Sequence, residues 1–81
     1  MKALVQVGLK KTVLDPQGKT IQAALAKMGF PGIADLRQAK LFELTLHDGG
    51  DPAAIRAQVE RAAREVLTNP VIEEYSIRWE D

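Results

Sequence analysis

The sequence predicts a small α+β domain: a two-layer sandwich in which an antiparallel sheet carries two helices on one face. Apolar residues alternate with a period of two over residues 2–11 and 71–79, as in half-buried strands. They recur at helical spacing over residues 16–28 and 52–67. Since two amphipathic helices can cover only one face of a small sheet, the order strand, helix, long strand, helix, strand predicts this architecture for a single domain over residues 1–81.

The first strand ends and the first helix begins within residues 14–20. Asp15 is suited to cap the helix, and Pro16 follows at the first helical position, where no backbone N–H is missed. Gly18 in the first turn costs about 1 kcal/mol relative to alanine, so helix propensity does not explain it. We therefore expect Gln17 and Gly18 to form a corner that another chain approaches closely.

The second extended segment covers residues 33–47. Gly29 suits the C-cap of the first helix, and Pro31 prevents its continuation. Residues 37–45 contain no Gly, Pro, Asn or Asp, so a two-residue hairpin turn is not indicated. We expect one long strand, bent or bulged near Ala39 and Lys40, and the alternative is two strands joined by a tight turn there.

The C-terminal third repeats the same signals. Asp51 and Pro52 cap and start the second helix, and Pro70 ends it after residue 67. The last strand, residues 71–79, places three large side chains on one face by its alternation: Tyr75, Ile77 and Trp79.

Composition limits the ways in which so small a core can be supported. The 81 residues include no cysteine, so no disulfide and no thiolate metal site can form, and the single His47 cannot build a zinc site alone. Small chains commonly add a disulfide, a metal or a partner chain, so a partner chain is the support that we expect. No apolar run approaches a membrane span of about 20 residues. We expect a cytoplasmic protein with no membrane contact.

Charge is balanced overall but unevenly distributed. Residues 1–47 carry seven basic and three acidic groups, and residues 48–81 carry four basic and eight acidic groups, so the halves are +4 and −4. A nucleic-acid partner would require a clustered basic face, which this distribution does not indicate. An uneven distribution of charge can instead steer association between proteins.

No catalytic constellation is recognisable. Ser76 lies mid-strand without an adjacent base, and His47 has no indicated partner. The glycines form neither a dinucleotide-binding nor a Walker pattern. Glu73 and Glu74 point to opposite faces of a strand, so they do not converge on one substrate. We expect no catalytic residue and no bound metal, and an interaction module rather than a self-sufficient enzyme.

The chain contains the segments LDPQG at residues 14–18 and NPVIEEY at residues 69–75, and between them the segments 21–25, 28–30 and 35–40 with 43–44. Together these segments resemble the PurS family, the small subunit of phosphoribosylformylglycinamidine (FGAM) synthase. The resemblance covers nearly the whole chain in the right order. Two departures are Ala39, where the family usually has glycine, and Thr68, where it commonly has alanine.

The resemblance implies a role in a complex. That complex converts formylglycinamide ribonucleotide, glutamine and ATP to FGAM, glutamate, ADP and phosphate in purine synthesis. The PurS-like chain is expected to be non-catalytic, to form a homodimer or tetramer, and to bridge a glutaminase subunit and a large synthetase subunit, where it helps ammonia to pass. ATP and Mg²⁺ belong to the complex, and this chain is expected to bind no cofactor.

The matching motifs supply the candidate contact residues. We expect partner contacts at Asp15, Gln17, Gly18, Arg37, Lys40, Glu43, Asn69, Glu73 and Tyr75.

Two other functions remain open at this stage. A ferredoxin-like or ACT-like regulatory domain would bind an amino acid at a dimer interface, and fold analogy alone supports it. A stand-alone enzyme would have to depend on His47.

Overall fold

The computed structural model describes residues 1–80 and contains one three-stranded antiparallel sheet with the strand order β2-β1-β3. The α+β class, the order of the elements and the antiparallel pairing are confirmed. Both helices begin at the Asp-Pro signals, with Asp15 and Asp51 as N-caps. The elements are β1 (Lys2–Leu9), α1 (Pro16–Lys27), β2 (Ala39–Thr45), α2 (Pro52–Ala62), the π-helical turn η1 (Ala63–Leu67) and β3 (Glu73–Glu80).

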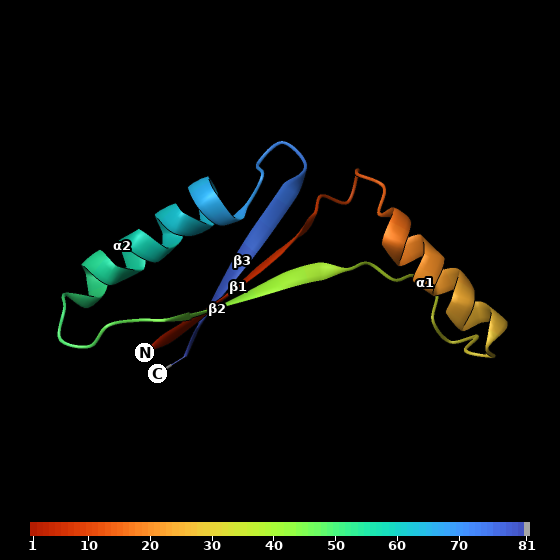
Figure 1. Ribbon diagram of the computed structural model, residues 1–81, viewed down its shortest axis with the longest axis horizontal. Coiled ribbons are helices and arrows are strands. Elements are labelled where there is room, and N and C mark those ends of the chain that lie inside the picture. Colours follow the sequence, from red (N-terminus) through yellow and green to blue (C-terminus); the bar gives the residue numbers. More distant parts are fainter. Residues whose placement is uncertain (81) are drawn as a thin grey trace.

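The strand register places the apolar side chains on one face of the sheet, called the inner face below. Ala3 lies between Leu44 and Trp79, and Val5 lies between Phe42 and Ile77. Helix α2 covers this face (Figure 1), where its Val59 and the Ala63 of η1 join the buried strand residues. The buried cluster consists of Ala3, Val5, Val7, Val59 and Ala63.

The opposite face of the sheet, called the outer face, carries no helix and is mostly polar. Gln6 and Ser76 pair across β1 and β3 on this face, and both are exposed. Leu4 and Leu41 are its large apolar residues, and Leu41 is 63% exposed. The expected alternation of Tyr75, Ile77 and Trp79 is confirmed, and these side chains lie on the inner face against the core.

Helix α1 does not cover the sheet, and this corrects the expectation of two helices on one face within a single chain. Figure 1 shows α1 as an arm beyond the end of the sheet, and the described chain is 52 Å long but only 13 Å thick. Neither the buried core nor the half-buried residues packed against it include a residue of α1. An amphipathic period indicates that a helix has a face to bury, but it does not say against which sheet.

The expected long strand over residues 33–47 is also corrected. Residues 33–38 are irregular, β2 starts at Ala39, and no hairpin divides the segment. The backbone N–H of Gln38 donates to the Asp15 carboxylate instead of to a neighbouring strand. Polar contacts with the segment before α1 therefore replace strand pairing at this point.

Candidate interaction surfaces

The two segments that join α1 to the sheet form a neck, defined here as residues 10–18 and 34–38. Asp15 is its central residue and is 6% exposed. One carboxylate oxygen, Oδ1, accepts the N–H of Gly18 at 3.0 Å, and Oδ2 accepts the N–H of Gln38 at 2.8 Å. The N–H of Gln38, then that of Gly18, and the nearby Arg37 charge lower the pKa of Asp15 below its ordinary value. One side chain thus caps α1 and fastens the returning segment beside it.

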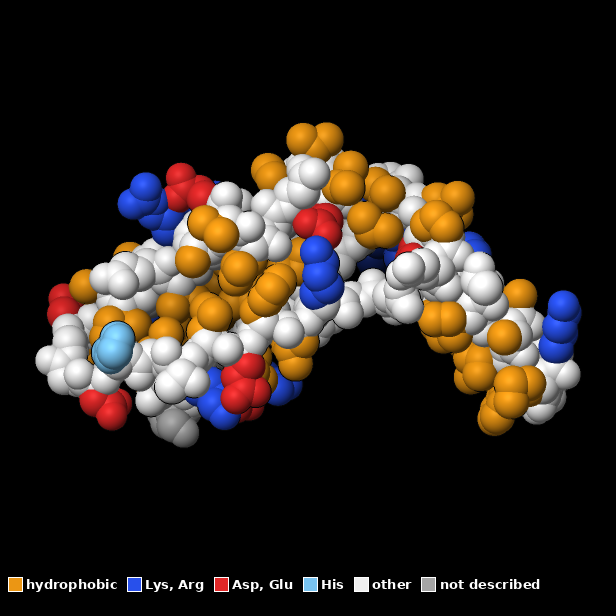
Figure 2. All heavy atoms as spheres, viewed as in Figure 1, with side chains coloured by type: hydrophobic (Ala, Val, Ile, Leu, Met, Phe, Trp, Pro, Cys, Tyr) orange, Lys and Arg blue, Asp and Glu red, His pale blue; other side chains and the backbone are white. Residues whose placement is uncertain are grey.

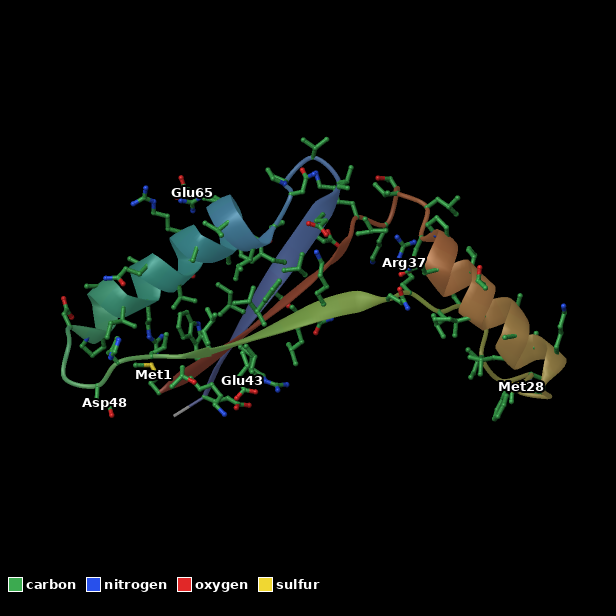
Figure 3. The ribbon with its side chains drawn as sticks, in the orientation of Figure 1. Met1, Met28, Arg37, Glu43, Asp48 and Glu65 are labelled. Carbon is green, nitrogen blue, oxygen red and sulfur yellow. The ribbon has the colours of Figure 1, made fainter. Side chains whose placement is uncertain are left out.

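Arg37 also joins the two segments of the neck. Its Nη2 donates to the carbonyl oxygen of Lys10 at 3.1 Å and to that of Val13 at 2.6 Å. Figure 3 shows Arg37 at the junction of the sheet and the arm. Because a charged donor strengthens hydrogen bonds to carbonyl oxygens, these contacts help to fix the direction in which α1 leaves the sheet.

Gly18 lies inside this neck, which corrects the reason for expecting it at a partner contact. The residue is buried, and a Cβ there would lie 2.4 Å from Asp15 Oδ2 and 2.9 Å from the carbonyl oxygen of Leu36. The close backbone approach expected at Gly18 therefore comes from the same chain. Gln17, its neighbour, is exposed.

Four of the expected contact residues converge on one cavity of about 460 Å³ at the neck end of the inner face: Asp15, Gln17, Lys40 and Glu73. Lys40 Nζ lies 3.5 Å from Glu73 Oε2, which joins β2 to β3 across the central strand. The sequence motifs are distant in the chain, and the sheet brings them to one end of the molecule.

Asn69 and Glu73 build the turn that precedes β3. Asn69 Oδ1 accepts the N–H of Val71 at 3.1 Å, and the N–H of Asn69 donates to Glu73 Oε1 at 2.8 Å. The Asn69 N–H is the main cause, with the Lys40 charge, of a lowered pKa at Glu73. The turn leaves Val71 78% exposed at its tip.

The remaining candidates lie elsewhere. Glu43 is on the outer face, where its carboxylate is 2.8 Å from Lys2 Nζ. Tyr75 packs against the core from the inner face, and with Arg37 it borders a second cavity of about 340 Å³. Glu43 is therefore not part of the neck, although one sequence motif suggested that it accompanies Arg37.

The largest feature that sequence reasoning missed is the apolar surface of the arm. Met28 is 72% exposed, Phe30 46% and Ile33 43%, and Ile21 of α1 is 37% exposed. Figure 2 shows apolar side chains gathered on the underside of the arm, facing the hollow between the arm and the sheet. Helical spacing over residues 16–28 predicted an apolar face that includes Ile21 and Met28, but it did not predict that this face stays exposed or that Phe30 and Ile33 extend it.

Residues that sequence reasoning did not single out also hold the arm together. Gln22 Nε2 donates to the carbonyl oxygen of Ala34 at 2.8 Å, and Lys19 Nζ lies 3.6 Å from Asp35 Oδ1. Within residues 1–80, no group of three or more His, Cys, Asp or Glu side chains could hold a metal ion. None of the helices in that same range is long and apolar enough to span a bilayer.

Fold and surfaces together define a small α+β chain with an arm, a neck and an uncovered apolar surface. Residues 2–81 match the family model described as PurS, phosphoribosylformylglycinamidine (FGAM) synthase. The chain belongs to the PurS family.

Individual relatives agree with this assignment. The chain is 40% identical over 79 residues to the FGAM synthase subunit PurS of Mycobacterium leprae, covering 98% of this chain and 95% of that protein. The crystal structure of Methanocaldococcus jannaschii PurS, described as one subunit of formylglycinamide ribonucleotide amidotransferase, superposes with a TM-score of 0.84 at 35% identity and covers 99% and 95% of the two chains. A chain of the Thermotoga maritima PurLQS structure superposes with a TM-score of 0.76 at 31% identity, covering 95% and 93%.

Proposed function

We propose that this chain is the bridging, non-catalytic subunit of an FGAM synthase complex in purine biosynthesis, and that it works as a homo-oligomer. The complex would convert formylglycinamide ribonucleotide, ATP and glutamine to FGAM, ADP, phosphate and glutamate. The glutaminase and large synthetase subunits would supply the reacting groups. ATP and Mg²⁺ would bind to those subunits and not to this chain.

The uncovered apolar surface of the arm carries this proposal. A soluble single chain seldom exposes contiguous apolar surface unless another molecule covers it. Here such surface extends from Ile21 of α1 to Ile33 in the segment after the helix, and none of residues 16–33 belongs to the chain's own core. Family membership adds support, because a chain of the PurLQS structure has the same fold.

The family match bears on the choice between the possible functions. A regulatory ligand-binding domain was supported by fold analogy alone, and the family match favours the assembly role. Passage of ammonia from the glutaminase to the synthetase is the second part of the proposal. The cytoplasmic location stays a prediction.

Reconstitution with and without this chain tests the proposal. FGAM formation is measured with the cognate glutaminase and synthetase subunits, once with glutamine and once with an ammonium salt as the nitrogen source. Omitting this chain should abolish the glutamine-dependent rate and leave most of the ammonium-dependent rate. Full glutamine-dependent turnover by the two other subunits would contradict the bridging role.

A further inference from the structure

We propose that Asp48 is a site of spontaneous isoaspartate formation, and that the product is a substrate for a carboxyl methyltransferase that uses S-adenosylmethionine. Asp48 lies in the loop between β2 and α2, residues 46–51. The inference is independent of the partner subunits proposed above, because it concerns a reaction of the chain with water and its repair by an enzyme of stated chemistry.

The reaction joins the Asp48 side chain to the backbone nitrogen of Gly49. That nitrogen attacks Cγ of the protonated carboxyl group and loses its hydrogen, and water leaves, so that a succinimide ring forms. Solvent water then opens the ring at one of its two carbonyl carbons. Attack at Cγ restores aspartate, whereas attack at the main-chain carbonyl leaves the chain running through Cβ and Cγ, which is isoaspartate. One water leaves and one enters, so no oxidant or reductant is needed.

The residue that follows each Asp or Asn decides whether the ring can form. A following proline prevents ring closure, because its nitrogen carries no hydrogen. This protects three residues: Asp15, Asp51 and Asn69. Asp35 is followed by Leu36, whose branched side chain hinders approach to the nitrogen. Only Asp48 is followed by glycine, which has no side chain to hinder the attack.

The structure leaves both reacting groups accessible. The Asp48 side chain is 97% exposed, and Figure 3 shows it on the loop, directed away from α2. Gly49 is exposed and has a φ of +83°, in the left-handed region that glycine adopts at little cost. Nothing lies within 4 Å of the position that a Cβ of Gly49 would take. Within residues 1–80, no carbonyl oxygen accepts the N–H of Gly49.

The other aspartates are held by the backbone. Asp15 accepts two N–H groups, Asp35 Oδ1 accepts the N–H of Leu36 at 2.8 Å, and Asp51 Oδ1 accepts the N–H of Ala53 at 3.1 Å. These hydrogen bonds fix the carboxylates in place, which adds to the protection that their following residues give. Sequence and structure therefore both single out residue 48.

Isoaspartate would alter the loop that leads into α2. It adds one carbon to the main chain just before Gly50, where a Cβ would lie only 3.1 Å from Ile55 Cδ1, and before Asp51, the N-cap of α2. Because α2 covers the inner face, displacement of its first turn should lower the melting temperature. The 3.8 Å contact between the Met1 ammonium and the carboxylate would also change, although exposed ion pairs contribute little.

A methyltransferase can reverse this change. Isoaspartate presents a carboxylate bonded directly to Cα on an exposed loop. Transfer of the methyl group from the sulfonium of S-adenosylmethionine to that carboxylate gives a methyl ester and S-adenosylhomocysteine. The Gly49 nitrogen then displaces methanol from the ester, which forms the succinimide again and returns part of the chain to aspartate.

Incubation of the folded chain at neutral pH in water labelled with heavy oxygen tests the proposal. Opening of the ring adds one labelled oxygen at the residue that reacted. After transfer to ordinary water, trypsin releases residues 41–56, with Asp48 and Asp51, and residues 28–37, with Asp35. Mass spectrometry with electron-transfer fragmentation locates the label and the isoaspartate. Both should be about tenfold or more higher at residue 48 than at residues 35 and 51, since only Asp48 precedes glycine.

Matched controls separate this reaction from general ageing of the chain. Asp48→Glu keeps the charge at an exposed position, but its larger ring forms slowly, so uptake of label in residues 41–56 should be lost. Gly49→Ala places a methyl group beside the attacking nitrogen and should slow the uptake. Circular dichroism establishes that each variant is folded. A synthetic peptide of residues 41–56 gives the rate without the fold, and the folded chain should react at a similar rate.

Methylation tests the second half of the proposal. The incubated chain, given S-adenosylmethionine with a labelled methyl group and a protein isoaspartate methyltransferase, should accept label in residues 41–56, whereas fresh chain and incubated Asp48→Glu should not. Equal heavy-oxygen uptake at residues 35 and 48 would overturn the site. A folded chain that reacts much more slowly than the peptide would show that the loop holds the Gly49 nitrogen out of reach. Undiminished methylation of Asp48→Glu would place the modified residue elsewhere.

Discussion

The two helices of this chain are similar in sequence pattern and opposite in their surroundings. Both follow an Asp-Pro start and both have an apolar face. Helix α2 buries Val59 against the central strand, whereas α1 leaves Met28 72% exposed on an arm. The difference shows that an apolar helix face does not by itself bring a helix into the core of its own chain. The segments that connect the helix to the sheet decide where that face points. The difference also predicts which substitutions affect folding and which affect assembly.

The largest expected effect separates the core from the arm. Val5→Ala removes two methyl groups from a side chain with no exposed surface and should lower the free energy of unfolding by about 2–3 kcal/mol. Met28→Ala on the arm should leave the unfolding of dilute, unassociated protein nearly unchanged and weaken association. Urea unfolding at two protein concentrations measures both effects. Equal loss of stability in the two variants at low protein concentration would contradict the view that Met28, unlike Val5, does not stabilise the single chain.

The neck is expected to be the next most sensitive region. Gly18→Ala should destabilise the chain by about 1–3 kcal/mol, because the added Cβ meets Asp15 and the Leu36 carbonyl and overpacks the site. Gly32→Ala is the matched control, since nothing lies within 4 Å of its added carbon. Thermal unfolding of both variants is the measurement. A Gly18→Ala chain as stable as the control would show that Asp15 and Leu36 can move to accommodate the added Cβ without loss of stability.

Acid should loosen the neck through Asp15. Its folded pKa lies below the ordinary value of 3.8, so its stabilising effect is present above that pH and is lost as the pH falls through the folded pKa. The melting temperature should therefore fall in acid, and Asp15→Asn should reduce the fall while lowering stability at neutral pH. Asp48→Asn, at a carboxylate side chain that is 97% exposed, is the control. An unchanged acid profile in Asp15→Asn would contradict this role.

The smallest effect is expected at the outer face. Lys2 and Glu43 form a 2.8 Å ion pair between partly exposed side chains, and such pairs contribute about 0–1 kcal/mol. Glu43→Gln should change stability by no more than this amount, and 0.5 M salt should reduce the difference further. A loss of complex assembly in Glu43→Gln would instead identify this residue as a partner contact.

Local signals in the sequence predicted much of the fold. Asp15 and Asp51 cap the two helices, and Pro70 lies beyond the end of the second helix. The alternation around Tyr75 correctly puts Tyr75, Ile77 and Trp79 on one face of β3, although it did not say that this face is the one against the core. These features depend on neighbouring residues, so a single sequence contains them. The helix expected over 52–67 corresponds to α2 followed by the π-helical turn η1.

The position of the arm could not be predicted in the same way. It depends on hydrogen bonds between distant segments, such as Gln38 to Asp15 over 23 residues and Arg37 to Lys10 over 27. The expected long strand failed for the same reason, because Arg37 and Gln38 bond to residues 10–15 rather than continuing β2. Gly18 gave a correct signal of close approach, and only the identity of the approaching chain was wrong.

Hydrogen exchange of backbone amides across a dilution series most directly tests the central claim, that association of this chain buries the apolar surface of the arm. The β1 amides should be protected at every protein concentration, because they bond within one sheet. The α1 amides should gain at least tenfold protection in step with the associated fraction. Unprotected α1 amides in a fully associated sample, or full protection in the monomer, would contradict the account.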